Sequence, residues 1–94
     1  MKFTHVDGKN KGNIILYALS TCVWCKRTKR LLNELGIAYD YIFVDLLNGD
    51  EKDYAKKQME KWNPRGSFPT IVIGNKKCIV GYDVEKIKEL SKNE

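Results

Sequence analysis

The stretch Ile14-Ile-Leu-Tyr-Ala-Leu19, followed by Ser-Thr and then by Cys22-Val-Trp-Cys25, decides the fold. The apolar run predicts a buried strand, and two thiols separated by two residues open the helical segment that follows it. A helix N-terminus has free N–H groups and the positive end of the helix dipole, and both stabilise a thiolate. The order of strand, C-x-x-C and helix therefore predicts a redox-active dithiol, with a nucleophile and its resolving thiol in one short segment.

Apolar spacing along the rest of the chain predicts alternating helices and strands. Apolar residues within 28–35 have helical spacing, and Gly36 is the expected C-cap of that helix. Residues 39–44 are β-branched and aromatic, which predicts a second core strand. The remaining predictions, in chain order, are a helix marked by Ala55, Met59 and Trp62, a loop over 63–69, strands at 70–73 and 76–80 joined by Gly74-Asn75, and a helix that begins after the N-cap Asp83.

This order predicts one α/β domain spanning residues 1–94, because the chain has 94 residues and no linker or repeat. The first strand–helix–strand unit implies a parallel pair of strands, and the hairpin at Gly74-Asn75 implies an antiparallel pair. We therefore expect a small mixed β-sheet flanked by helices. Residues 3–6 alternate apolar and polar, so we also expect an extra N-terminal strand there, in a hairpin with residues 13–19.

Composition excludes several other classes of protein. The net charge of +5 is modest and dispersed, so nucleic-acid binding is not favoured, and no segment approaches the ~20 apolar residues of a membrane span. Three cysteines with one close pair do not resemble a secreted disulfide framework, and residues 1–12 lack the apolar core of a signal peptide. We therefore expect a cytoplasmic protein. Because His5 is far from the cysteine pair in sequence, no metal site is expected.

Three motifs, in this order, resemble those of the glutaredoxin family of the thioredoxin fold. They are Cys22-Val-Trp-Cys25, Ser67-Phe68-Pro69-Thr70 and Gly81-Tyr82-Asp83 just before the last helix, and the resemblance covers nearly the whole chain from Asn13 onward. It implies that Cys22 attacks a substrate disulfide and that Cys25 resolves the mixed disulfide. It also implies a cis Pro69 facing the dithiol, Phe68 offering its backbone to an extended substrate, and Gly81, Tyr82 and Asp83 lining the far side of the groove.

The resemblance implies no bound cofactor. Electrons would come from a small thiol such as glutathione or from a reductase, with glutathione reductase and thioredoxin reductase as the candidates. The partner would be a disulfide-containing protein or a small-thiol mixed disulfide, and we expect a monomer. The residue types at two positions depart from the family pattern: Leu19 replaces a lysine, and Val84 replaces an acid. Both departures concern the residues that hold the charged ends of glutathione.

These departures leave two alternatives open. One is a thioredoxin-like protein-disulfide reductase that does not use glutathione, because Cys22-Val-Trp-Cys25 also looks like the redoxins that serve ribonucleotide reductase. The other is an iron–sulfur carrier or a redox-sensing adaptor, in which a cluster would bridge two chains through Cys22. Protein purified without oxygen separates the alternatives, since a brown dimer indicates the carrier and a colourless monomer the enzyme.

Four further residues are candidates near the dithiol. A helix dipole typically stabilises a charge by only ~0.3–1 kcal/mol, so a strongly populated thiolate needs additional help. We predict that Lys26 and Arg27 stabilise the thiolate, and that Arg65 binds a substrate carboxylate. Trp24 lies between the two cysteines, and we predict an exposed side chain there that contacts the substrate.

Overall fold

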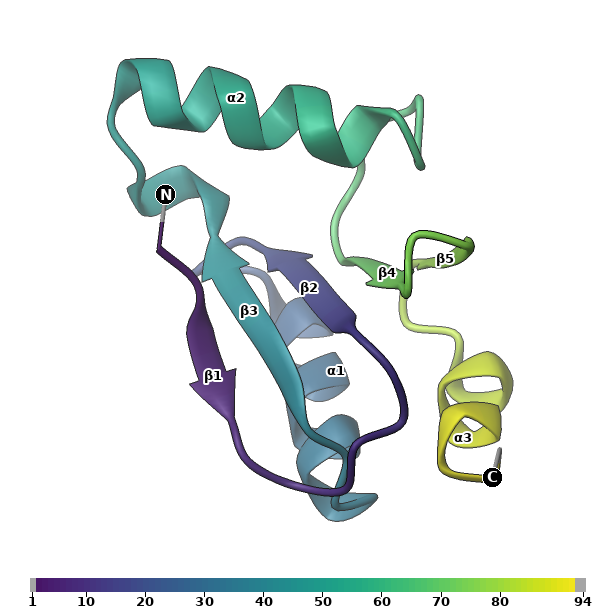
Figure 1. Ribbon diagram of the computed structural model, residues 1–94. Coiled ribbons are helices and arrows are strands. Elements are labelled where there is room, and N and C mark those ends of the chain that lie inside the picture. The colour runs from purple at the N-terminus through teal and green to yellow at the C-terminus, as the bar shows by residue number, and fades with distance from the viewer. Residues whose placement is uncertain (1, 93–94) are drawn as a thin grey trace.

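A five-stranded sheet in the order β1-β3-β2-β4-β5 forms the centre of the molecule. The computed structural model describes residues 2–92. Figure 1 shows the arrangement of the elements, which in chain order are β1 (Thr4–Val6), β2 (Ile14–Ala18), α1 (Val23–Glu34), β3 (Tyr39–Phe43), the short 3-10 helix η1 (Val44–Leu46), α2 (Gly49–Glu60), β4 (Thr70–Ile73), β5 (Lys77–Val80) and α3 (Val84–Lys92).

The sheet is mixed, as predicted. β2 runs parallel to β3 on one side and antiparallel to β4 on the other, and β4 and β5 form an antiparallel hairpin. At the hairpin turn Gly74 and Asn75 have φ angles of 56° and 55°. Positive φ at both central residues is typical of the two-residue turn whose twist matches that of the flanking strands, and Gly and Asn adopt it at low cost. This sheet and its three helices confirm the expected α/β architecture.

The N-terminal strand is present, but the hairpin expected with residues 13–19 is not formed. β1 pairs antiparallel with β3 instead, with His5 opposite Asp40. Both edges of β2 are occupied, by β3 and by β4, so β1 cannot pair with β2 and pairs with the outer edge of β3. Gly8 allows the connecting loop to approach the chain closely, because a Cβ atom there would lie 2.6 Å from the Gly36 carbonyl oxygen.

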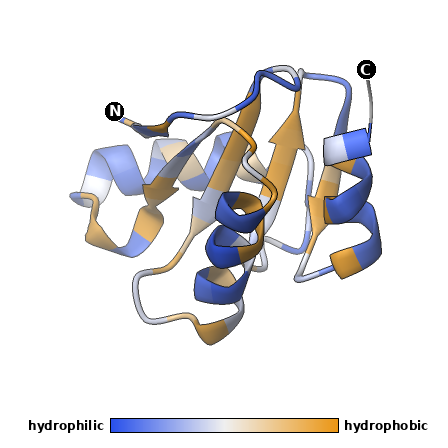
Figure 2. Cartoon of the chain, turned by 90° about the horizontal axis from the view of Figure 1, so that it is seen from below, coloured by the Kyte–Doolittle hydropathy of each residue, from blue (hydrophilic) through white to orange (hydrophobic). Residues whose placement is uncertain are grey.

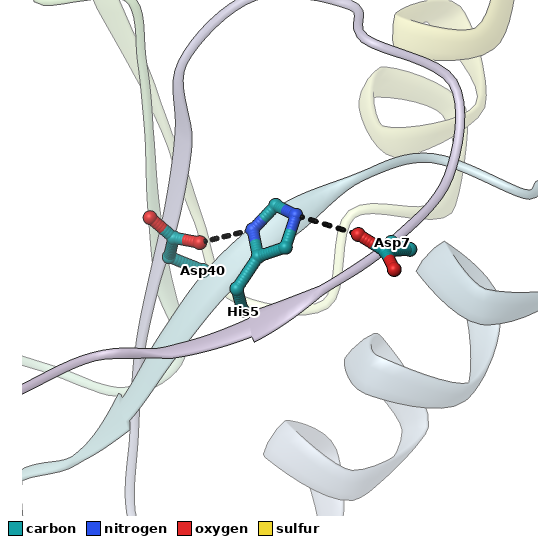
Figure 3. A network of polar contacts seen from close by, with 3 residues as sticks. All are labelled: His5, Asp7 and Asp40. Carbon is teal, nitrogen blue, oxygen red and sulfur yellow. Dashed lines mark hydrogen bonds and ion pairs between the residues drawn. The ribbon is translucent and has the colours of Figure 1, made fainter.

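A histidine holds β1 to the sheet (Figure 3). The His5 Nδ1 atom lies 2.6 Å from an oxygen of Asp40, and its Nε2 atom lies 3.1 Å from an oxygen of Asp7. The hydrogen bond with Asp40, aided by the negative charges of Asp40 and Asp7, raises the pKa of His5 above its usual value. Asp40 is level with Ile15 near the start of β2, so this contact lies at the opposite end of the strands from the dithiol.

Alternating residues of the strands supply two apolar cores, one on each face of the sheet. On one face Ile14, Leu16 and Ala18 of β2 pack with buried residues of α1 and α3, and on the other face Tyr17 packs with residues of α2. Figure 2 shows the apolar strands lying between helices whose outer surfaces are hydrophilic. None of the helices in the described part of the chain has the length and apolar character needed to cross a membrane.

Candidate active site

Cys22 is the N-cap of α1, and Cys25 is the third residue of the helix. The Cys22 Sγ atom accepts a hydrogen bond from the backbone N–H of Cys25 at 3.1 Å. This satisfies one of the N–H groups that a helix leaves free at its start, and it places the sulfur at the positive end of the helix dipole. The Cys22 side chain is half-buried and Cys25 is buried, with 1% of its surface exposed. Of the two thiols of this pair, Cys22 is therefore the more accessible to another molecule.

The two thiols differ in acidity because they differ in environment. Burial, and in second place the hydrogen bond with Cys22, raises the pKa of Cys25 to about 12. Desolvation always disfavours the charged form of a thiol. A pKa of about 12 keeps the Cys25 thiol protonated at neutral pH.

The segment before Cys22 is held by an acid that the sequence analysis did not assign. The Asp45 carboxylate accepts hydrogen bonds from the Ser20 N–H at 2.9 Å and from the Ser20 hydroxyl at 2.5 Å. The hydrogen bond from the Ser20 hydroxyl is the main cause of a lowered pKa of Asp45, and the bond from the Ser20 N–H adds to it. The sequence did contain a signal, because Asp45 follows β3 as Ser20 follows β2, and the carboxyl ends of parallel strands meet at one edge of a sheet. Asp45 therefore positions the turn that presents Cys22.

A second loop faces the groove beside the dithiol with a cis peptide bond between Phe68 and Pro69, as the family resemblance implied. Asn63 fastens this loop: its side-chain nitrogen donates to the Ser67 carbonyl at 3.2 Å, to the Ser67 hydroxyl at 3.1 Å and to the Thr70 hydroxyl at 2.9 Å. The Thr70 hydroxyl in turn donates to the Ser67 carbonyl at 2.8 Å. Asn63 is 3% exposed and Thr70 is fully buried. Sequence reasoning placed Asn63 in a loop but gave it no role.

A shallow groove of about 290 Å³ brings together five of the predicted substrate-binding residues: Trp24, Phe68, Pro69, Gly81 and Tyr82. Trp24 is 53% exposed, as predicted, and its ring stacks on Tyr82 with centroids 5.9 Å apart. The Gly81 N–H donates to the Pro69 carbonyl at 2.8 Å, which ties the two walls together. The groove is largely apolar and opens to solvent, a shape suited to an extended segment of another molecule.

The other predicted residues lie outside this groove. Asp83 is the N-cap of α3, where its carboxylate accepts the Lys86 N–H at 3.1 Å. Arg65 is exposed and does not line the groove. Lys26 is exposed, and the Arg27 guanidinium lies over the Trp24 ring, 4.8 Å from its centroid. The roles of these four side chains in binding or in thiolate stabilisation stay predictions.

The third cysteine is separate from this site. Cys78 is half-buried on β5, and its thiol donates to the Trp62 carbonyl at 3.3 Å. Within residues 2–92 no three His, Cys, Asp or Glu side chains gather as metal ligands. A larger hollow of about 530 Å³ lies beside His5 and Asp40, but it contains no thiol and is remote from Cys22. The chemistry of the described chain is therefore concentrated at the dithiol and its groove.

Known proteins share this sequence and architecture. The glutaredoxin family model matches residues 14–79. Glutaredoxin 1 of Rickettsia conorii is 34% identical over 82 residues, which cover 84% of this chain and 78% of the relative. The glutaredoxin structure from Methanosarcina mazei Go1 has a TM-score of 0.90 and 44% identity, and the match covers 99% of this chain and 90% of that one. Methanoredoxin from Methanosarcina acetivorans has a TM-score of 0.88 and 48% identity, covering 92% of this chain and 90% of that one.

These matches include the strands and helices that carry the dithiol, and they confirm the thioredoxin-like fold expected from the motif order. The family's activity is exchange between thiols and disulfides, which the pair Cys22 and Cys25 is arranged to perform. The protein therefore belongs to the glutaredoxin family, and it is a thiol-disulfide oxidoreductase.

Proposed function

We propose that Cys22 is the attacking thiol and that Cys25 is the resolving thiol. The Cys22 thiolate attacks one sulfur of a substrate disulfide, a new S–S bond forms, and the departing substrate thiolate takes a proton from solvent. Cys25 then loses its proton and attacks the Cys22 sulfur, which releases the second substrate thiol. The substrate gains two electrons and the protein is left with a Cys22–Cys25 disulfide. The difference in exposure and acidity between the two thiols carries this proposal.

The raised pKa of Cys25 fits the second step of this cycle. Burial is the largest cause of this raised pKa and the hydrogen bond with Cys22 is the second, and negative charge on Cys22 opposes ionisation of Cys25 in the same direction. Formation of the mixed disulfide removes the charge on Cys22 and with it one of the causes that raise the pKa of Cys25. Cys25 is therefore easier to deprotonate after the first step than before it.

The substrate that suits the groove best is a disulfide in an extended polypeptide segment. Among residues 2–92 the Phe68 N–H and carbonyl have no hydrogen-bond partner, so both are available to pair with a substrate strand. The groove beside them is lined by apolar surface of Trp24, Pro69 and Tyr82. A segment bound in this way would place its cysteine against the N-terminus of α1.

Glutathione is a weaker candidate for the principal substrate. Leu19, at the position where family members commonly have a lysine, packs against the apolar core on the α2 face. Val84 packs against the core on the opposite face, and Asp83 is engaged in capping α3. Glutaredoxins as a family draw electrons from glutathione or from a reductase. We propose that glutathione or a reductase reduces the Cys22–Cys25 disulfide, and that this chain in turn reduces disulfides of proteins.

One comparison tests this proposal. The same wild-type sample is given a glutathione-mixed disulfide coupled to glutathione reductase, and insulin with dithiothreitol or thioredoxin reductase as the donor. We expect the higher catalytic efficiency with insulin. Activity confined to the glutathione-mixed disulfide would overturn the substrate assignment, and activity with neither would overturn the oxidoreductase cycle itself. The Cys22→Ser variant is the control that removes the attacking thiol.

We also propose a cytoplasmic location and a monomeric state. A single close cysteine pair in a small domain is the usage typical of transient, catalytic disulfides in a reducing compartment. Cell fractionation tests the location, and sedimentation of protein purified without oxygen tests the monomer. A brown, iron-containing dimer would instead indicate the cluster-carrier alternative.

A further inference from the structure

A second hollow of about 290 Å³ lies next to the groove, on the exposed face of α1. It is lined by Arg27, Arg30, Leu31, Glu34 and Tyr82. Tyr82 belongs to the walls of both hollows, and Arg27 reaches the groove by lying over Trp24. A ligand that fills the groove can therefore extend into this second hollow without leaving the surface of the protein.

The net charge of the side chains that line this hollow is positive. Neither the Arg27 nor the Arg30 guanidinium forms an ion pair with a carboxylate of residues 2–92. Glu34, the one acid of α1, lines the hollow as well, so one of its two positive charges is offset. The neighbouring Lys29 is directed elsewhere, because its Nζ atom lies 3.8 Å from the centroid of the Tyr41 ring.

The spacing along α1 sets the reach of a substrate. Arg27 and Arg30 follow the N-cap Cys22 by five and eight positions, which corresponds to ~7–12 Å along a helix that rises 1.5 Å per residue. An extended peptide covers that distance in about two to four residues at ~3.3 Å each. A side chain at such a position would lie over the two guanidinium groups while the cysteine of the same peptide is at Cys22.

We propose that this hollow binds an acidic side chain, located two to four residues from the reactive cysteine of a disulfide-bearing polypeptide. The inference rests on the proposed function and specifies its substrate class. Arginine suits the role because its planar guanidinium can donate two parallel hydrogen bonds to one carboxylate. Leu31 and Tyr82 supply apolar surface for the carbon chain of a glutamate.

The test uses two peptide disulfides that differ only in charge. Both contain one cysteine per peptide, with glutamate at the third position before and after it in one peptide and glutamine at those positions in the other. The readout is the ratio of kcat/KM for the two disulfides. We expect the wild-type protein to favour the glutamate peptide by ~2- to 5-fold at low ionic strength, the upper part of the range that exposed ion pairs provide, and less as salt is added.

Two double variants with the same loss of charge locate the effect. Arg27→Gln/Arg30→Gln should reduce the ratio to about 1, whereas Lys56→Gln/Lys57→Gln on exposed positions of α2 should retain the wild-type ratio. A wild-type ratio of about 1 would overturn this inference while leaving the oxidoreductase function intact. An equal fall in both variants would also overturn it, because the preference would then come from net charge alone. Failure to reduce either peptide would overturn the inference and the proposed function together.

Discussion

Replacing Asn63 by alanine tests how the loop of Phe68 and Pro69 is held in place. Asn63 lies just after α2, and its buried amide nitrogen is within hydrogen-bond distance of three oxygens of Ser67 and Thr70. An amide has two N–H groups, so two of these contacts can be made at full strength at one time. The Asn63→Ala variant loses both of them without altering the groove or the dithiol directly.

The expected loss of stability in Asn63→Ala follows from the two hydrogen bonds removed and from the partners that stay satisfied. A net contribution of about 1 kcal/mol for each of two hydrogen bonds gives a loss of about 2 kcal/mol in the free energy of unfolding. The loss is not greater because the Ser67 carbonyl still accepts from the Thr70 hydroxyl at 2.8 Å, and Ser67 is exposed to water. For a domain of 94 residues this corresponds to a fall of about 8–16 °C in Tm.

Chemical denaturation measures this loss, and disulfide reduction by the same samples measures the effect on the loop. We expect kcat/KM to fall as well, because the loop carries Phe68 and Pro69, which we propose bind the substrate. Asn10→Ala is the matched control: its side chain is exposed and accepts only the Gly12 N–H, so the change should stay within about 0.5 kcal/mol. Thr70→Val should be coupled to Asn63→Ala by about 1 kcal/mol in a double-mutant cycle. A loss below about 0.5 kcal/mol for Asn63→Ala, or strict additivity with Thr70→Val, would show that these hydrogen bonds do not hold the loop.

Three other predictions concern charged groups. NMR titration should give His5 a pKa above its ordinary value, and Asp40→Asn should lower that pKa. Because the pKa is raised in the folded state, the contribution of His5 to stability is complete below the pKa of the unfolded state. This contribution disappears as pH rises through the pKa of the folded state. An unshifted His5 would contradict the contact in Figure 3. Asp45→Asn should destabilise the protein at neutral pH and lose its effect in acid, because the lowered pKa of Asp45 contributes stability only while the group is ionised; a pH-independent loss measured by denaturation would argue against this. Lys26→Ala should slow alkylation of Cys22 at neutral pH by reducing its thiolate fraction, and an unchanged rate would exclude the electrostatic role of Lys26.

Local patterns predicted much of the fold because they report on local physics. Gly36 illustrates this: it ends α1 with a φ of 69°, and hydrogen bonds from Gly36 to Asn33 and from Ile37 to Leu32 close the helix in the way that a C-terminal glycine favours. The predicted partner of β1 was wrong because strand pairing at a sheet edge is not set by local sequence. The partner of an edge strand depends on which edges the rest of the sheet leaves free, and the composition of residues 3–6 contains no information on that.

In the candidate site, too, local features could be predicted from the sequence and contacts set by tertiary structure could not. Cys22 and Cys25 were identified from spacing alone, and the resemblance to glutaredoxins added the cis Pro69, which base rates for proline would not predict. The contact of Asp45 with Ser20 joins residues 25 positions apart, and only the parallel pairing of β2 and β3 brings them together. The stacking of Trp24 on Tyr82 depends equally on tertiary structure.

The central claim is that Cys22 attacks and Cys25 resolves, and trapping of the mixed disulfide tests it most directly. Reduced Cys25→Ser and Cys22→Ser variants, each also carrying Cys78→Ser, are mixed with a peptide disulfide and followed by intact-mass spectrometry. We expect Cys25→Ser to gain one peptide rapidly through Cys22, and Cys22→Ser to gain none on that timescale because Cys25 is buried and protonated. Faster labelling of Cys22→Ser than of Cys25→Ser would contradict it.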